Sequence, residues 1–309
     1  MKRGGSHLRN ADSNMSWLIT GGSGQLGISL SNELTKQGII FQAWSSQDLD
    51  IRQKENAKSE IFKLSPKVIV NCAAWTDVDG AENHEEFAAE VNAIGAENIA
   101  VAAKNCKARL IQVSTDYVFS GKSNAPWSVD SEISPNTAYG RTKAEGEKRV
   151  LATYPENSYI LRTAWLYSPW RKNFAKTMLK KAIYSDNEVL VVNDQIGQPT
   201  SAIDLAKQII KLVESDSPAG VYHGTNSGSA TWFDFARYLF EKAGADVSRV
   251  RPVESTRYRS QAVRPEFSVL DHKKWSTTTI GEMQNWKMAL DEQFSLILEA
   301  VMKGGGEIA

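Results

Sequence analysis

Three residues near the middle of the chain carry side chains suited to moving a proton onto or off an oxygen atom. Tyr139 and Lys143 lie four positions apart in the run YGRTK, and Thr115 follows the apolar stretch Leu110 to Val113. Side chains at positions i and i+4 of a helix share one face, so we expect the phenol and the ammonium to be neighbours. Such a trio suits the interconversion of a carbonyl and an alcohol.

The pairing of Tyr139 with Lys143 has an energetic rationale. A free tyrosine titrates near 10, and lowering its pKa by about three units requires about 4 kcal/mol. An ammonium about 4 Å away in a partly wet site supplies roughly that much. Thr115 would add a hydrogen bond to the reacting oxygen. The spacing alone is more often a partly exposed tyrosine beside a solvated lysine, so the interpretation needs support from the rest of the chain.

Because no side chain carries hydride, a redox cofactor must supply it, and a site for one is predicted near the N-terminus. The strand-like run Ser16 to Thr20 is followed directly by GGSGQLG, Gly21 to Gly27, and then by an amphipathic helical pattern. Glycines in such a turn let the backbone approach a pyrophosphate that lies against the N-terminal amides of the helix. The pattern therefore indicates a dinucleotide-binding turn, with a flexible glycine turn as the alternative.

The expected second strand, Ile39 to Trp44, does not decide which dinucleotide binds. It ends in Ser45-Ser46-Gln47, without an acid for the 2′-hydroxyl of NAD or an arginine for a 2′-phosphate. NADH and NADPH both remain compatible with this end. Asp50 and Ile51 could frame the adenine, although a solvated helix cap explains Asp50 equally well.

Alternating strand and helix patterns predict an α/β fold with a doubly wound, parallel Rossmann-type sheet. Ligands of such sheets bind at the carboxyl ends of the strands. Four residues lie just beyond the ends of expected strands, which favours one shared site: Gly24, Ala74, Thr115 and Trp165.

The length of 309 residues favours about two domains. We expect residues 1–14 to be a disordered or non-native tail and residues 15–165 to form the dinucleotide-binding domain. Residues 166–309 would form mainly a smaller C-terminal substrate-binding domain, with some segments returning to the first sheet.

Composition excludes several classes of protein. Lysine plus arginine and aspartate plus glutamate both total 36, which argues against a chain built to coat nucleic acid but leaves local basic patches open. No apolar run reaches the roughly 18 residues of a membrane span, and the N-terminus lacks the apolar core of a signal peptide. The two cysteines, Cys72 and Cys106, and the four histidines have no metal-ligand spacing. We therefore expect a cytoplasmic protein with reduced thiols and without a predicted metal, nucleic-acid or membrane partner.

With these motifs in place, the chain resembles the extended short-chain dehydrogenase/reductase family over nearly everything from Met15 onward. The runs that carry the resemblance include GGSGQLG, VNCAAWTDVDGAE, STDYVFSG, YGRTKAEGE, LRTAWLY, VNDQIGQPT and RPEFSVLD. It is most similar to members that reduce the C4 keto group of a dTDP-linked 4-keto-6-deoxyhexose with NADPH or NADH. The resemblance implies that Thr115, Tyr139 and Lys143 are the catalytic trio, with the tyrosine as proton donor, and that a dTDP-sugar is the substrate.

The resemblance also implies binding roles residue by residue. Gly24, Gln25 and Leu26 would meet the cofactor diphosphate, and Asp50 and Ile51 the adenine. Ala74, Trp75, Thr76 and Val113 would line the nicotinamide side, where Tyr139 and Lys143 also bind the cofactor. The remaining cofactor-binding candidates are Gly21, Ser45, Ala73 and Asn92. The sugar would be held by Thr115, Asp116 and Trp165, with Gln195 and Arg264 as further candidates for the nucleotide half.

The acidic loop Asp77 to Glu82 matches no calcium-binding pattern and is typical of a solvated loop, but the family uses this loop near the substrate. Two positions depart from the family pattern. WSSQDLD leaves the choice between NADH and NADPH open, and Trp127 stands where relatives often carry a tyrosine.

The sequence leaves three alternative functions on the same fold open. A sugar-nucleotide dehydratase would need a glutamate after the Thr-Asp pair, where this chain has Tyr117. An epimerase would retain its cofactor tightly, and a regulatory subunit would bind nucleotide without turnover, although the intact trio argues against it. A homodimer is compatible with this reading, and neither the oligomeric state nor a Mg²⁺ ion at a subunit contact can be read from the sequence.

Overall fold

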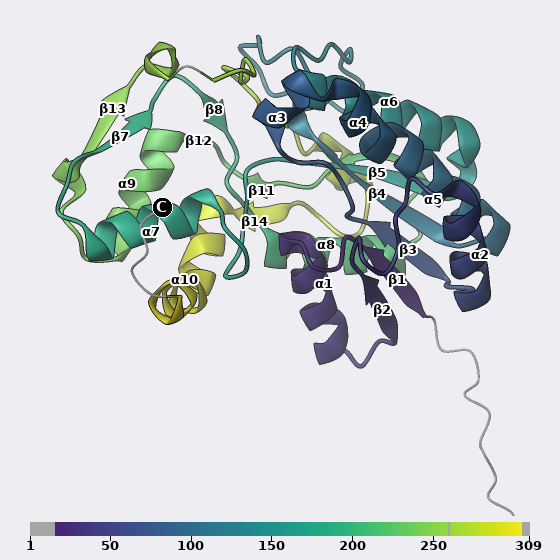
Figure 1. The fold of residues 1–309 in the computed structure, drawn as a ribbon. Helices are drawn as coiled ribbons and strands as arrows, with labels where there is room; N and C mark the ends of the chain where they lie inside the picture. The colour runs from purple at the N-terminus through teal and green to yellow at the C-terminus, as the bar shows by residue number, and fades with distance from the viewer. Residues whose placement is uncertain (1–15, 259, 305–309) are drawn as a thin grey trace, which may run out of the picture.

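A six-stranded parallel sheet forms the centre of the first structural unit (Figure 1). The computed structural model describes residues 16–258 and 260–304, so the tail expected at residues 1–14 lies outside the described residues. Every neighbouring pair of strands is parallel, which confirms the predicted doubly wound sheet. The strand order is β10 (Gly220–His223), β5 (Ser158–Thr163), β4 (Arg109–Thr115), β3 (Val68–Asn71), β1 (Trp17–Thr20) and β2 (Phe41–Trp44).

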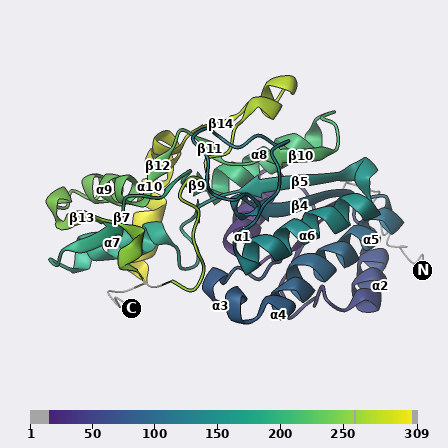
Figure 2. The ribbon, with the colours of Figure 1, turned by 90° about the horizontal axis from the view of Figure 1, so that it is seen from above.

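Helices cover both faces of this sheet. One face packs against α1 (Gln25–Lys36) and α8 (Ala202–Glu214), and the other against α2 (Lys54–Leu64), α5 (Ala96–Cys106) and α6 (Ala138–Thr153). Figure 2 shows α5 and α6 running side by side along their face. Because β1 and β3 are buried along their whole length, their sequences are nearly continuous apolar runs rather than alternating ones.

Between β3 and α5 the chain forms two short helices and a π-helical turn. These are α3 (Val78–Asn83), α4 (Glu85–Ala89) and the π-helix Glu90–Gly95. Single π-turns occur mostly at functional sites, because they turn side chains off the regular helical face. Asn92, a polar interruption in an otherwise apolar helical pattern, lies in this turn and is buried.

The second unit has its own core, built from α7 (Phe174–Tyr184), α9 (Trp232–Lys242) and α10 (Trp286–Lys303). Four two-stranded sheets surround it: β7 (Val189–Val192) with β13 (Val250–Val253), β8 (Ile196–Gly197) with β12 (Ala230–Thr231), β6 (Leu166–Tyr167) with β9 (Thr200–Ser201), and β11 (Asn226–Ser227) with β14 (Met283–Asn285). Between these segments the chain returns to the first sheet through α8 and β10.

Five short 3₁₀ helices complete the described part of the chain: Asp116–Val118, Pro155–Asn157, Val247–Arg249, Ser255–Arg257 and Lys273–Thr277. Among the described helices, none combines the length and the apolar character needed to cross a membrane.

Helix α6 is fixed to the sheet by a buried ion pair. Arg162 of β5 and Glu147 of α6 are 2.8 Å apart, and their side chains are only 2% and 3% exposed. The guanidinium donates three hydrogen bonds to the carboxylate and a fourth to the carbonyl of Val129. It also lies over the ring of Phe119, 5.0 Å from its centroid. Two buried charges satisfied in this way hold α6 in one position against the strand ends.

Replacing Glu147 with glutamine should destabilise the protein strongly, because it leaves the buried Arg162 charge without its partner. We expect Glu147→Gln to lower the free energy of unfolding by about 3–5 kcal/mol. Urea unfolding followed by circular dichroism measures this change.

The matched control lies two residues earlier on the same helix. Glu145 pairs with Arg149 at 2.8 Å, but both side chains are about 40% exposed. Glu145→Gln should therefore cost less than about 1 kcal/mol. Equal losses in the two variants would contradict a special role for the buried pair.

Candidate active site

The glycine turn between β1 and α1 has a geometry that only glycine permits. Gly21 has a φ of +67°, and a Cβ added to it would lie 2.6 Å from the backbone nitrogen of Ala73. A Cβ on Gly27 would lie 2.5 Å from the carbonyl oxygen of Gly21. The turn is thus closed tightly against both the helix and the neighbouring strand end.

The start of α1 leaves space for an anionic group. Its N-cap is Gly24, which has no side chain with which to cap the first amides. Among the described residues, a Cβ added to Gly24 would approach only the Gly21 carbonyl, at 3.3 Å. Free N-terminal amides beside an open glycine turn fit the diphosphate of a dinucleotide.

Gln25 connects this turn to the second unit. Its side-chain oxygen accepts hydrogen bonds from the Ser168 hydroxyl and the Asn173 amide, both at 2.9 Å. Its amide donates to the carbonyl of Leu166 at 3.4 Å. Leu26, by contrast, is buried in the core between α1 and the sheet. Of these two candidates, Gln25 therefore fixes the rim of the site, whereas Leu26 can offer a ligand only its backbone.

The predicted cofactor-binding residues that follow β2 form hydrogen bonds and ion pairs with their neighbours in the sequence. The backbone and hydroxyl of Ser45 both donate to Asp48, and the Asp50 carboxylate pairs with Arg52 at 2.7 Å. The Arg52 hydrogen bond keeps the pKa of Asp50 below its usual value. Ile51 is buried, so only its backbone could face an adenine. The carboxylates of Asp48 and Asp50 are thus both paired with neighbouring residues of the chain.

The loop after β3 is fixed from behind by Asn92. Its side-chain oxygen accepts from the Trp75 backbone nitrogen at 2.9 Å, while its amide donates to the Trp75 carbonyl and to the Thr142 hydroxyl. Asn92 thus ties the segment containing Ala73, Ala74 and Thr76 to helix α6. The structure places Asn92 as a support for the loop that follows β3.

The expected trio does come together at the carboxyl end of β4. Thr115 ends that strand, and Tyr139 lies in the first turn of α6, near enough for the Thr115 hydroxyl to affect the pKa of the phenol. Lys143, one turn later, is buried and donates to the carbonyl of Val113 at 2.7 Å. The Tyr139 ring also packs edge-on against Tyr117, with the ring centroids 5.6 Å apart.

The expected lowering of the tyrosine pKa is not found. Burial raises the pKa of Tyr139 to about 12, the Thr115 hydrogen bond lowers it less, and the Asp116 charge raises it further. Burial also lowers the pKa of Lys143 to about 8, against the charges of Glu147 and Cys72. The ammonium is bound to the Val113 carbonyl instead of the phenol, which stays protonated at neutral pH.

Asp116 is the buried carboxyl of the site. It is 2% exposed, and its Oδ1 accepts a 2.9 Å hydrogen bond from the Thr115 hydroxyl. Burial raises its pKa to about 6, although hydrogen bonds from Ser268 and Thr115 act in the opposite direction. A carboxyl of this kind can hold Thr115 in one orientation and still exchange a proton near neutral pH.

The substrate candidates of the second half reach the same end of the sheet by different routes. Trp165 directly follows β5 and stacks on Trp232 of α9. Arg264 pairs with Asp79 at 2.7 Å, and the Asp79 carboxylate also accepts from the backbone of Ala262. Asp79 therefore anchors a distant loop and is more than a solvated acid. Gln195 is buried and lies just before β8.

Sequence reasoning missed Trp232, Ser268 and the Asp79 partner of Arg264. Asp79 and Arg264 are 185 positions apart, so no local pattern could have paired them. Among the described residues, no three or more histidine, cysteine, aspartate or glutamate side chains lie together in a way that could hold a metal ion.

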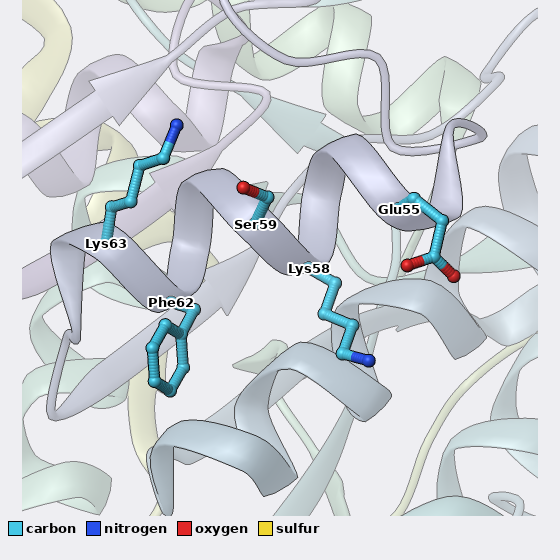
Figure 3. A pocket seen from close by; sticks show the side chains of 5 residues that line it. All are labelled: Glu55, Lys58, Ser59, Phe62 and Lys63. Atoms are coloured by element: carbon cyan, nitrogen blue, oxygen red, sulfur yellow. The ribbon is translucent and has the colours of Figure 1, made fainter.

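A separate hollow lies on the outer surface of α2 (Figure 3). It is lined by Glu55, Lys58, Ser59, Phe62 and Lys63. All five side chains come from this one helix and none is a site candidate, so the hollow is not part of the site.

Comparisons with known proteins agree with this arrangement. A family model described as "RmlD substrate binding domain" matches residues 15–298. A dTDP-4-dehydrorhamnose reductase of Streptomyces griseus is 42% identical over 282 residues, covering 90% of this chain and 92% of the relative. A dTDP-4-keto-6-deoxy-D-glucose reductase of Streptomyces niveus is 41% identical over 281 residues, covering 91% and 97%.

Among solved structures, a dTDP-4-dehydrorhamnose reductase of Clostridium acetobutylicum superposes with a TM-score of 0.87 at 39% identity, covering 92% of this chain and 99% of the other. The enzyme of the same name from Bacillus anthracis, in complex with NADP, has a TM-score of 0.88 at 35% identity with the same coverage.

The raised pKa of Asp116 should make stability depend on pH. The folded carboxyl titrates at about 6 and its ordinary value is 3.8, so between these values the folded state binds the extra proton. Stability should therefore fall as the pH rises from about 4 to about 6, by no more than about 3 kcal/mol.

Asp116→Asn removes this dependence and isolates it from other groups. The stability of the wild type minus that of Asp116→Asn, from urea unfolding at several pH values, should decrease up to about pH 6 and then level off. A constant difference across the series would contradict the assignment.

Proposed function

The chain belongs to the RmlD substrate binding domain family, and on that premise we propose that it is a dTDP-4-dehydrorhamnose reductase. It reduces the C4 keto group of dTDP-4-dehydro-L-rhamnose to give dTDP-L-rhamnose, with NADPH or NADH. The observation that carries the proposal is the meeting of Tyr139 with Thr115 at the carboxyl end of β4, on the edge where the glycine turn opens. A ketone held there has a neutral acid beside its oxygen.

The chain's own residues provide the cofactor site. The amides at the start of α1 would hold the diphosphate, and the small side chains of Ala73 and Ala74 leave room for a flat ring. When bound, the reduced nicotinamide supplies the hydride that no side chain can provide. The NADP complex of the Bacillus anthracis enzyme supports NADPH as a cofactor. We propose that either dinucleotide is accepted, because the carboxylates that follow β2, Asp48 and Asp50, are already paired with Ser45 and Arg52.

Tyr139 is the proton donor in this mechanism. Its raised pKa keeps the phenol protonated while the substrate is a ketone. Once negative charge develops on the C4 oxygen, that oxygen is far more basic than the oxygen of the ketone. The phenol proton then moves to that oxygen and leaves a phenolate. Lys143 stabilises the phenolate by its charge.

The remaining candidates orient the substrate. Thr115 donates its hydroxyl proton to Asp116, and on substrate binding this proton would turn to the C4 oxygen. Trp165 lies on the sugar side, and Gln195 and Arg264 would meet the nucleotide half. Because Arg264 is paired with Asp79, we expect it to share its guanidinium between the carboxylate and a diphosphate.

A second function favoured by a specific observation is a reductase of the same class acting on a different 4-keto sugar. The Streptomyces niveus relative, whose name specifies a D-glucose-derived substrate, is nearly as similar as the Streptomyces griseus one. Comparing rates with the two dTDP-linked ketones separates the alternatives.

The free cysteines Cys72 and Cys106 support a cytoplasmic site of action, where thiols stay reduced.

The decisive experiment follows the oxidation of NADPH or NADH in the presence of dTDP-4-dehydro-L-rhamnose, with dTDP-L-rhamnose identified as the product. An absence of turnover with both dinucleotides would refute the proposed function. An inactive protein that nonetheless binds the nucleotide would favour the regulatory alternative, and NAD that stays bound through purification would favour an epimerase.

Removing the Tyr139 hydroxyl should abolish catalysis without emptying the cofactor site. We expect Tyr139→Phe to lower kcat by about 10²–10⁴-fold, which is the rate enhancement that a general acid usually contributes. Its dissociation constant for NADPH, from quenching of tryptophan fluorescence, should stay near the wild-type value.

The control is the same chemical change at the other end of the same helix. Tyr154 is the C-cap of α6, and its hydroxyl accepts a hydrogen bond from Asn157. Tyr154→Phe should keep the wild-type kcat. A Tyr139→Phe protein with near-normal turnover would rule out Tyr139 as the acid.

A further inference from the structure

Two tryptophans from different units stack face to face beside the sugar site. The ring centroids of Trp165 and Trp232 are 3.5 Å apart and the ring planes differ by 8°. Trp165 follows β5 of the parallel sheet, whereas Trp232 is the first residue of α9 in the second unit. The stack is therefore a direct contact from the second unit to a residue proposed to hold the sugar.

Trp232 is itself held firmly in place. The Thr231 hydroxyl and the Asp234 carboxylate form a complete capping box at the start of α9. Phe174 of α7 packs against the Trp232 ring, with centroids 4.6 Å apart. Phe174 in turn stacks on Phe235, one turn into α9. These contacts restrict the Trp232 side chain to one orientation.

The opposing position of Trp165 is equally restricted. Its φ is +45°, a conformation that bulky residues rarely adopt, and its carbonyl accepts from the backbone of Thr200. A Cβ added to Gly197 would lie 2.5 Å from the indole of Trp165. Gly197 belongs to β8, which pairs with β12 immediately before Trp232 (Figure 1). One two-stranded sheet therefore supplies the space for the indole through Gly197 and leads directly into the stacking ring of Trp232.

We propose that Trp232 is a positioning residue for the sugar-nucleotide site and acts by holding the indole of Trp165 in its stacked orientation. The inference rests on the proposed function, because it assigns a role to Trp232 within the same site. Trp232 need not touch the substrate for this role. It selects one orientation of Trp165, which otherwise would have to be ordered each time the sugar binds.

The expected effect is confined to sugar binding. Loss of a stacked aromatic pair corresponds to about two- to tenfold in an equilibrium constant. Trp232→Leu should therefore raise the KM for dTDP-4-dehydro-L-rhamnose about two- to tenfold, with an unchanged KM for NADPH. Trp232→Phe, which can still stack, should restore most of the loss.

A spectroscopic signature reports the stack independently of turnover. Two indoles in face-to-face contact couple their transitions and give paired circular dichroism bands of opposite sign. We expect this couplet in the wild type, and we expect it to vanish in Trp232→Leu and Trp232→Phe, because each variant leaves only the Trp165 indole of the stacked pair. A wild-type spectrum without the couplet would overturn the proposal.

Phe240→Leu is the matched structural control. Phe240 is buried in the same core two turns further along α9, where its ring lies under the guanidinium of Arg249. This variant should lower the melting temperature and keep both the couplet and the sugar KM. If it raised the sugar KM as much as Trp232→Leu does, the effect would be one of general stability and the proposal would fail.

The remaining outcomes separate this inference from the proposed function. A Trp232→Leu protein that turns over the sugar with wild-type KM and kcat overturns the positioning role and leaves the reductase assignment intact. A wild type without turnover of the sugar nucleotide overturns both. If Trp232→Leu does not fold, the test uses Trp232→Phe, which can still stack and should keep most of the affinity for the sugar. A sugar KM raised more than tenfold in Trp232→Phe would also refute the role.

Discussion

The position of helix α6 rests on one buried ion pair. Glu147 lies one turn beyond Lys143 and binds Arg162, which belongs to the strand beside β4. Removing two charges from water is costly, and the several hydrogen bonds between these groups offset that cost only in one geometry. The pair therefore specifies the position of α6, and through it the positions of Tyr139 and Lys143. The Glu147 charge also favours the ammonium of Lys143 against the effect of burial.

Burial rather than ion pairing sets the protonation of the site. The pKa values of Tyr139 and Asp116 are raised to about 12 and about 6, and that of Lys143 is lowered to about 8, each with desolvation as the largest cause. All three shifts favour the neutral form. A neutral phenol beside a carbonyl is the state that a reduction needs before the proton moves. The same environment would make charge that appears on the substrate oxygen interact strongly with nearby dipoles.

The site is completed by contacts between chain segments that are far apart in sequence. Gln25 meets Leu166, Ser168 and Asn173, more than 140 positions away. Asp79 pairs with Arg264, and Trp165 stacks on Trp232. Each contact joins the parallel sheet or its helices to the second half of the chain. The second unit therefore closes the edge of the sheet on which the dinucleotide turn opens.

Local spacing was enough to identify the parallel sheet, the glycine turn and the meeting of Thr115 with Tyr139, because each depends on residues near one another or on the shared edge of parallel strands. The sequence alone therefore determined which residue types could act together at that edge. It could not determine the direction of the Tyr139 pKa shift, because the ammonium of Lys143 is bound by the Val113 carbonyl and burial outweighs its charge. Nor could it find Trp232 or the Asp79 partner of Arg264. Desolvation and long-range pairing depend on which distant segments cover a side chain, and only the tertiary structure decides that.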